Sequence, residues 1–202
     1  MVSTLALPTL ERRAVRLAWA TIAWNVVEAV VAIAAGTAAS SIALVGFGLD
    51  STVEVMSALV IVWQLRGLSH ARERRALRLI AVSFYVLALY VSVQAIIDLL
   101  GTSAASGSPV GIGLAVASLV VMPVLARAKR RNGRLLGSPT VVADSNQTSL
   151  CAYLSAILLG GLALNATVGW WWADPIAALA IAVLAANEGR QAWRGETCDD
   201  CC

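Results

Sequence analysis

Charged residues are scarce in this 202-residue chain. Only 13% of its residues are charged, whereas 59% are hydrophobic and the mean hydropathy is +0.78. A typical soluble domain has about 25% charged residues, so this composition excludes an ordinary soluble domain. It predicts an all-α, polytopic membrane protein. The net charge of +3 is interpreted as membrane topology and contact with the lipid bilayer, and no nucleic-acid partner is expected.

Histidine is nearly absent, and the motifs of common enzymes are missing. The single histidine, His70, lies in LRGLSHARERR and is interpreted as a solvated loop residue. We find no nucleophile–base pair, phosphate-binding glycine loop or haem motif, so an enzyme is not expected. An intramembrane aspartyl protease, which also needs two carboxylates, is the weaker alternative. No signal peptide is expected, because the charges of MVSTLALPTLERRAVR follow a short mixed segment.

Six apolar segments have lengths near the roughly 20 residues that a transmembrane helix needs. The sixth is the least apolar, because Asn187, Glu188 and Arg190 lie in its last turns. The predicted membrane domain is 14–192, between a cytoplasmic segment at 1–13 and a short tail at 193–202. The predicted spans are Ala14–Gly36, Ser41–Gln64, Ala76–Leu100, Pro109–Ala126, Val142–Val168 and Asp174–Ala192.

Basic residues occur at both ends of the predicted membrane domain and in every second connection between its spans. They occur before the first span, between the second and third, between the fourth and fifth, and at the end of the sixth. The other three connections carry none. By the positive-inside rule, both termini and the two basic loops are cytoplasmic. We therefore expect a multi-pass protein of the cell membrane, in particular a bacterial inner membrane.

Four predicted helices contain polar residues three, four or seven positions apart, which places them on one face. Such faces point into a bundle interior or a wet cavity, because lipid does not satisfy polar groups. These polar stripes are Thr21, Asn25 and Glu28; Asp50, Glu54, Ser57 and Gln64; Ser83, Tyr90, Gln94 and Asp98; and Asp144, Gln147, Thr148, Cys151 and Ser155.

Asp50 and Glu54, in the segment GFGLDSTVEV, are predicted near the middle of the second span. A charged group there costs roughly 3 kcal/mol on an insertion scale. No lysine or arginine is predicted deep in any span, so these carboxyl groups are expected to bind a proton or a mobile metal ion. The alternative is a neutral carboxyl group that joins helices by hydrogen bonds, which fits a single buried acid better than a pair.

Several motifs together resemble the cation diffusion facilitator family. They are the D-x-x-x-[DE] pair on the second span, a polar pair four apart on the fifth, and WADPIAALAIA at the start of the sixth. The segments WNVVEAVVA, GFGLDSTVEV and VADSNQTSLCAYLSA are similar to a short branch related to vesicular zinc transporters, which lacks the usual cytoplasmic domain. The resemblance implies proton-coupled export of divalent metals from the cytoplasm by alternating access. Without the cytoplasmic domain, a homodimer is expected to form through membrane helices.

The resemblance also implies a set of metal ligands. In the family, two residues on the second helix and two on the fifth form the site, and these positions correspond to Asp50, Glu54, Gln147 and Cys151. Gln147 departs from the family pattern, because an amide oxygen is a poor zinc ligand, whereas a cysteine thiolate suits zinc. The predicted ligands are Asp50, Glu54 and Cys151, with Asp144, Gln147 and Glu28 as candidates for the fourth position.

Two carboxylates and a thiolate favour zinc, cobalt or cadmium over magnesium or calcium, and iron(II) and manganese(II) stay open. The ion is expected as cargo, and no cofactor is predicted. Metal binding needs deprotonated ligands, so loading would release protons. A sensor or scaffold that binds metal without moving it would need the same ligands, and only flux separates the two functions.

The C-terminal sequence TCDDCC contains three of the four cysteines. Because the tail is predicted to be cytoplasmic, structural disulfides are not expected. Cys198, Cys201 and Cys202 either capture a thiophilic metal together with the two neighbouring aspartates or belong to a frayed terminus. The sequence leaves both interpretations open.

Overall fold

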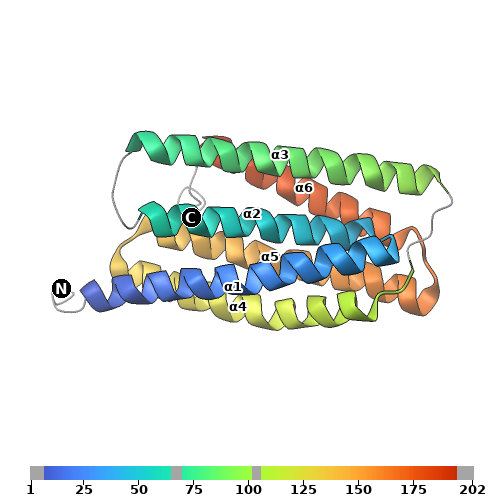
Figure 1. The fold of residues 1–202 in the computed structure, drawn as a ribbon, viewed down its shortest axis with the longest axis horizontal. Helices are drawn as coiled ribbons and strands as arrows, with labels where there is room; N and C mark the ends of the chain where they lie inside the picture. Colours follow the sequence, from blue (N-terminus) through green and yellow to red (C-terminus); the bar gives the residue numbers. More distant parts are fainter. Residues whose placement is uncertain (1–6, 65–69, 102–105, 195–202) are drawn as a thin grey trace.

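The computed structural model describes residues 7–64, 70–101 and 106–194, which form an elongated bundle of antiparallel helices (Figure 1). No strand occurs in these ranges, so the predicted all-α class is confirmed. The cysteine tail lies outside the described residues. The helices are α1 (Leu7–Ala39), α2 (Ile42–Gln64), α3 (His70–Leu100), α4 (Pro109–Leu136), α5 (Pro139–Val168) and α6 (Ala173–Arg194).

Within the described ranges, five helices are long and apolar enough to cross a membrane, namely α1 to α5. The sixth, α6, has 22 residues but carries Glu188, Arg190 and Arg194 in its last turns. It nevertheless runs along the same axis as the others (Figure 1). Large apolar side chains such as Val86 and Leu89 of α3 are exposed on the outside, as lipid contact requires. The chain is a polytopic membrane protein.

The helices extend beyond several predicted spans. Helix α1 begins at Leu7 and α3 at His70, a residue predicted to lie in a loop, while α4 continues through Pro123 to Leu136. The predicted spans were delimited by apolar residues, but a helix continues through charged residues where these have good helix propensity. Consequently Lys129, predicted in a cytoplasmic loop, lies inside α4.

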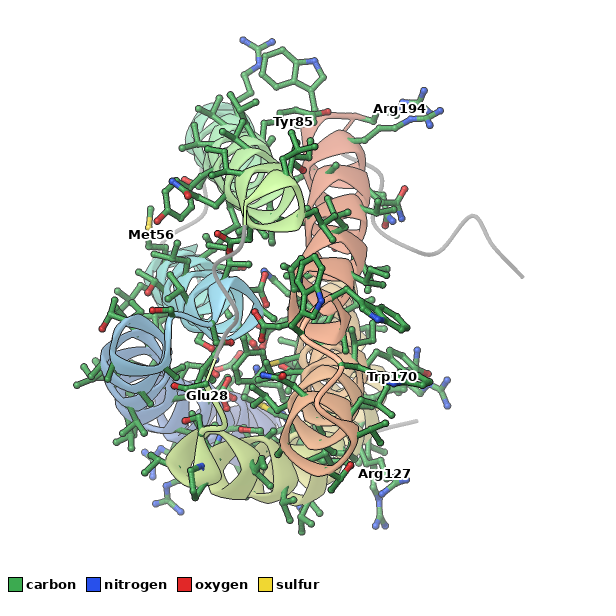
Figure 2. The ribbon with its side chains drawn as sticks, turned by 90° about the vertical axis from the view of Figure 1, so that its right-hand side faces the viewer. Glu28, Met56, Tyr85, Arg127, Trp170 and Arg194 are labelled. Carbon is green, nitrogen blue, oxygen red and sulfur yellow. The ribbon has the colours of Figure 1, made fainter. Side chains whose placement is uncertain are left out.

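The six helices form two groups. Helices α1, α2, α4 and α5 pack together as a four-helix bundle, with α1 along α2 and α4 along α5. The other two, α3 and α6, form a pair that contacts the bundle through α2 and α5 (Figure 2). We call these groups the four-helix bundle and the α3–α6 pair. We call the end at which α1, α3 and α5 begin the basic end, because Arg12, Arg78 and Arg134 lie there.

Side-chain oxygens cap the starts of two helices, in one case from the adjacent residue and in the other from a different helix. Ser108 caps α4, with its hydroxyl accepting from the N–H of Gly111. Asp174, in the first turn of α6, is buried, and its carboxylate reaches the start of α2. It accepts from the Ser41 hydroxyl at 2.5 Å and from the N–H of Ala43 at 3.3 Å. The first N–H groups of a helix lack partners within that helix, which explains this contact.

Three of the four predicted polar stripes face the interior. Thr21, Asn25 and Glu28 are fully buried on α1, and the stripes of α2 and α5 are mostly buried. The stripe of α3 is not inside the bundle, since Tyr90 is exposed and Asp98 is only half-buried. The α3–α6 pair sits at the side of the bundle, so this face of α3 has no surrounding helices.

Candidate metal site

A small cavity lies between the four-helix bundle and the α3–α6 pair. Asp50 and Glu54 of α2 line it together with Gln147 of α5 and Glu188 of α6. Its volume of about 10 Å³ is room for one water molecule or one desolvated ion. The remaining lining is apolar and consists of Phe84, Leu150, Leu154, Leu184 and Ala185.

The two α2 carboxylates have little hydrogen-bonding support. Asp50 is 7% exposed and makes no hydrogen bond to another described residue. Glu54 is 2% exposed, and its Oε1 accepts from the Thr148 hydroxyl at 2.9 Å. A buried carboxylate without sufficient donors is stable only when it binds a proton or a cation. This part of the cavity is therefore suited to a positively charged guest.

Gln147 is the α5 residue that reaches the same cavity. Its side-chain carbonyl accepts a hydrogen bond from the Ser57 hydroxyl of α2 at 2.8 Å. A carbonyl oxygen has two lone pairs, so this bond leaves one free. The Ser57 contact also orients the amide, which is half-buried. Gln147 can thus offer a neutral oxygen opposite Asp50 and Glu54.

Glu28 and Cys151 form a separate cluster and do not line the cavity. The Cys151 thiol donates to Glu28 Oε1 at 3.5 Å, and the Ser51 hydroxyl donates to the same oxygen at 2.6 Å. The other oxygen accepts from the Trp24 indole at 2.8 Å and from the Ser118 hydroxyl. Four helices are joined through this one carboxyl group. Glu28 therefore matches the helix-joining interpretation of a buried acid.

Asp144 is paired with a lysine, which corrects the prediction that no cation lies near the buried acids. Lys129 Nζ lies 2.7 Å from Asp144 Oδ2, and both side chains are buried. The same ammonium donates to the Thr148 hydroxyl at 2.9 Å. Asp144 does not line the cavity, and in this conformation Lys129 compensates its charge.

Sequence reasoning missed Lys129 and Glu188 as members of the region. A signal for Lys129 exists, because it lies seven residues after Met122 and eleven after Ser118, on the buried face of α4. Glu188 lies fourteen residues after Asp174, which places it on the buried face of α6. Sequence reasoning missed it because it stands among the polar residues at the end of that helix. Within the described residues, no three carboxylate, thiol or imidazole groups converge as a ready-made metal site.

The fold and the cavity describe a multi-pass membrane protein with buried acidic residues around an internal cavity. Residues 76–194 match the family model described as the cation efflux transmembrane domain. That match covers more than half of the chain, so the protein belongs to the cation efflux family, and the predicted resemblance is confirmed.

A relative is found in Synechocystis sp., where it is named as an uncharacterized transporter. The two chains are 28% identical over 152 residues, which cover 70% of this chain and 49% of the relative. This chain thus spans about half the length of the curated relative it matches. The name of the relative describes a transporter, and the family model describes a cation efflux domain.

Proposed function

We propose that the protein exports a divalent transition-metal ion from the cytoplasm, with zinc as the first candidate, in exchange for protons. The observation that carries this proposal is the pair of buried carboxylates, Asp50 and Glu54, on a cavity with room for one ion. Their two negative charges balance one divalent cation. Gln147 and water would complete the oxygen ligands in this conformation.

Proton exchange follows from the same two carboxylates. A metal ion binds only to their deprotonated forms, so metal loading releases protons and protonation favours metal release. Alternating exposure of the cavity to the two sides of the membrane would couple the two fluxes. The cavity lies where the α3–α6 pair meets the four-helix bundle, so relative movement of these groups would change access to it.

Glu188 is proposed as the first contact of an incoming ion. It lies two residues before Arg190, toward the basic end of α6, and is half-buried on the same cavity as Asp50. The basic end is proposed to be cytoplasmic, in agreement with the positive-inside rule. A carboxylate at this position would attract a cation from the cytoplasm before it reaches Asp50 and Glu54.

Cys151 is proposed to contribute to metal selectivity at another stage of transport. It lies one helical turn beyond Gln147 on α5, away from the basic end, and its thiol now donates to Glu28. Movement of α5 relative to α1 would free this sulfur. A thiolate favours zinc and cadmium over magnesium.

The surroundings of the protein are also part of the proposal. We propose a bacterial inner membrane and a homodimer formed through membrane helices. Large apolar side chains exposed on α3, among them Ile96 and Ile97, suit either lipid or a second copy of the chain. A sensor or scaffold that binds metal without moving it is the alternative function.

Metal flux into proteoliposomes that contain a zinc-sensitive dye tests the proposal. Zinc, cobalt, cadmium and magnesium are offered separately, each with and without a pH gradient. We expect zinc flux that depends on the gradient and falls at least about tenfold in Asp50→Asn, which removes one ligand charge. Asp98→Asn is the matched control, because Asp98 is half-buried on α3 and does not line the cavity.

Two further variants test the assigned roles. Glu188→Gln is expected to raise KM for zinc more than it lowers kcat, and Cys151→Ser to weaken discrimination between cadmium and magnesium. Absence of flux for every metal, in protein that still binds zinc, would reject transport and leave the sensor or scaffold. Equal flux in Asp50→Asn and wild type would reject the cavity as the transport site.

A further inference from the structure

Lys129 occupies a position that the proposed transport function does not explain. It is the only lysine of the sequence, since all other basic side chains except His70 are arginines. Lys129 is 1% exposed, whereas its neighbours Arg127, Arg130 and Arg131 are exposed. Figure 2 shows the side chain of Arg127 pointing away from the bundle. A single cation of α4 is therefore directed inward.

The contacts of Lys129 connect three helices. Its ammonium on α4 lies 2.7 Å from Asp144 Oδ2 and donates to the Thr148 hydroxyl at 2.9 Å, both on α5. Lysine can only donate, so the oxygen of Thr148 accepts this bond. The Thr148 hydrogen is then available for Glu54 Oε1 of α2, at 2.9 Å. Lys129 and Thr148 thus connect Asp144 to Glu54.

The second carboxylate oxygen of Asp144 supplies an independent observation. Asp144 Oδ1 is buried and has no hydrogen-bond partner. A buried carboxylate normally has donors for both oxygens, so this oxygen is free to accept a ligand. The lysine compensates the charge of Asp144 but leaves part of its binding capacity unused.

We propose that Lys129 is a tethered counter-cation that sets the metal affinity of the transport site. The ammonium holds Asp144 apart from the site, so that an ion meets two carboxylates, Asp50 and Glu54, and not three. The net charge offered by these four side chains is then −2, which matches one divalent cation. A third carboxylate would bind the ion more tightly and slow its release, and transport requires binding weak enough for the ion to leave.

This inference rests on the proposed metal transport and deepens it. The alternative is a purely structural ion pair that ties α4 to α5. A buried ion pair is weak evidence for stability, because hydrophobic replacements of both partners are often neutral. A structural role predicts no change in metal affinity, and this difference is measurable.

Zinc affinity is measured by titration calorimetry on the full chain in detergent micelles, with flux kinetics in proteoliposomes alongside. In Lys129→Met, Asp144 is free to join the ion, so Kd and KM for zinc are expected to fall about tenfold. The value of kcat is expected to fall as well, because release becomes slow. Arg127→Met removes the same charge from the exposed face of α4 and should leave Kd unchanged.

A double variant identifies the group through which the lysine acts. Lys129→Met combined with Asp144→Leu removes both partners, and Kd should return to within about twofold of wild type, since the additional ligand is gone. If Lys129→Met does not fold, Lys129→Gln removes the charge while keeping a donor for Asp144, and the same fall in Kd is expected.

Three results separate the hypotheses. Unchanged or weaker zinc binding in folded Lys129→Met or Lys129→Gln, with normal binding by wild type, would overturn the role of Lys129 alone. A double variant that binds as tightly as the single one would also overturn it, because Asp144 would not be the added ligand. Failure of wild type to bind zinc would instead reject the proposed function on which the inference rests.

Discussion

The interactions within the four-helix bundle differ from those within the α3–α6 pair. Inside the bundle, buried polar groups of α1, α2, α4 and α5 bond across helices, as at Glu28 and at Lys129. The α3–α6 pair has close contacts of small and apolar residues, where Gly189 meets Ala81 and Phe84, and one cation–π contact between Arg78 and Trp193. Directional bonds hold helices in one geometry, whereas apolar contacts tolerate sliding. The comparison suggests a rigid bundle beside a movable pair.

The candidate cavity lies between these two groups. Its carboxylates Asp50 and Glu54 come from the bundle, and Glu188 comes from α6. Movement of the pair would therefore change access to the ion without breaking the hydrogen bonds around Glu28. At the opposite end from the basic residues, Asp174 fastens α6 to the start of α2 and would serve as a fixed point. Substitutions in the bundle, at this fixed point and in the pair test the comparison.

The largest effect is expected at Glu28. Glu28→Leu removes the acceptor of the buried Ser118 hydroxyl and of the Cys151 thiol. The Trp24 indole keeps only its longer contact with Ser118. Because each unsatisfied buried group costs about 1–3 kcal/mol, we expect a loss of about 3 kcal/mol in unfolding free energy. Chemical unfolding in detergent micelles, followed by circular dichroism, measures it. Glu11→Leu on the exposed face of α1 is the control, and equal stability of the two variants would contradict a rigid polar bundle.

A smaller effect is expected where the pair is fastened to the bundle. Asp174→Ala removes the acceptor of the Ser41 hydroxyl and of the Ala43 N–H, and loss of such a cap costs about 1 kcal/mol. The same unfolding measurement applies. Asp174→Asn keeps acceptor oxygen and should lose less. If both variants are as stable as wild type, α6 is not fastened at this point.

The smallest effect is expected within the α3–α6 pair. A Cβ at Gly189 would lie 3.2 Å from the Ala81 carbonyl oxygen and from Phe84 Cβ, so Gly189→Ala forces the two helices apart. We expect a loss of about 0.5 kcal/mol together with altered zinc flux, because the better helix propensity of alanine offsets most of the cost of mild overpacking. Gly160→Ala is the matched control, because a Cβ there meets nothing within 4 Å. Unaltered flux in a folded Gly189→Ala protein would argue against movement of the pair.

Helical periodicity in the sequence predicted much of the fold but less of the candidate metal site. The polar residues of α1, α2 and α5 repeat every three or four positions, and these faces are buried as predicted. The same pattern on α3 gave a wrong prediction of burial, because a polar stripe shows which face of a helix is polar but not whether other helices surround that face. Asp174 shows a related limit, because its partners lie at the start of another helix and spacing along α6 does not reveal them.

By itself, the sequence determined an all-α membrane protein with buried acids on its second helix, because composition and helical period are local properties. Only the tertiary structure decided which acids share a cavity. Asp50 and Glu54 line it with Gln147 and Glu188, whereas Glu28 and Asp144 have donors or a cation of their own. Whether a buried carboxyl group is free for a metal depends on what neighbouring helices place beside it, and helix packing, not spacing along one helix, determines those neighbours.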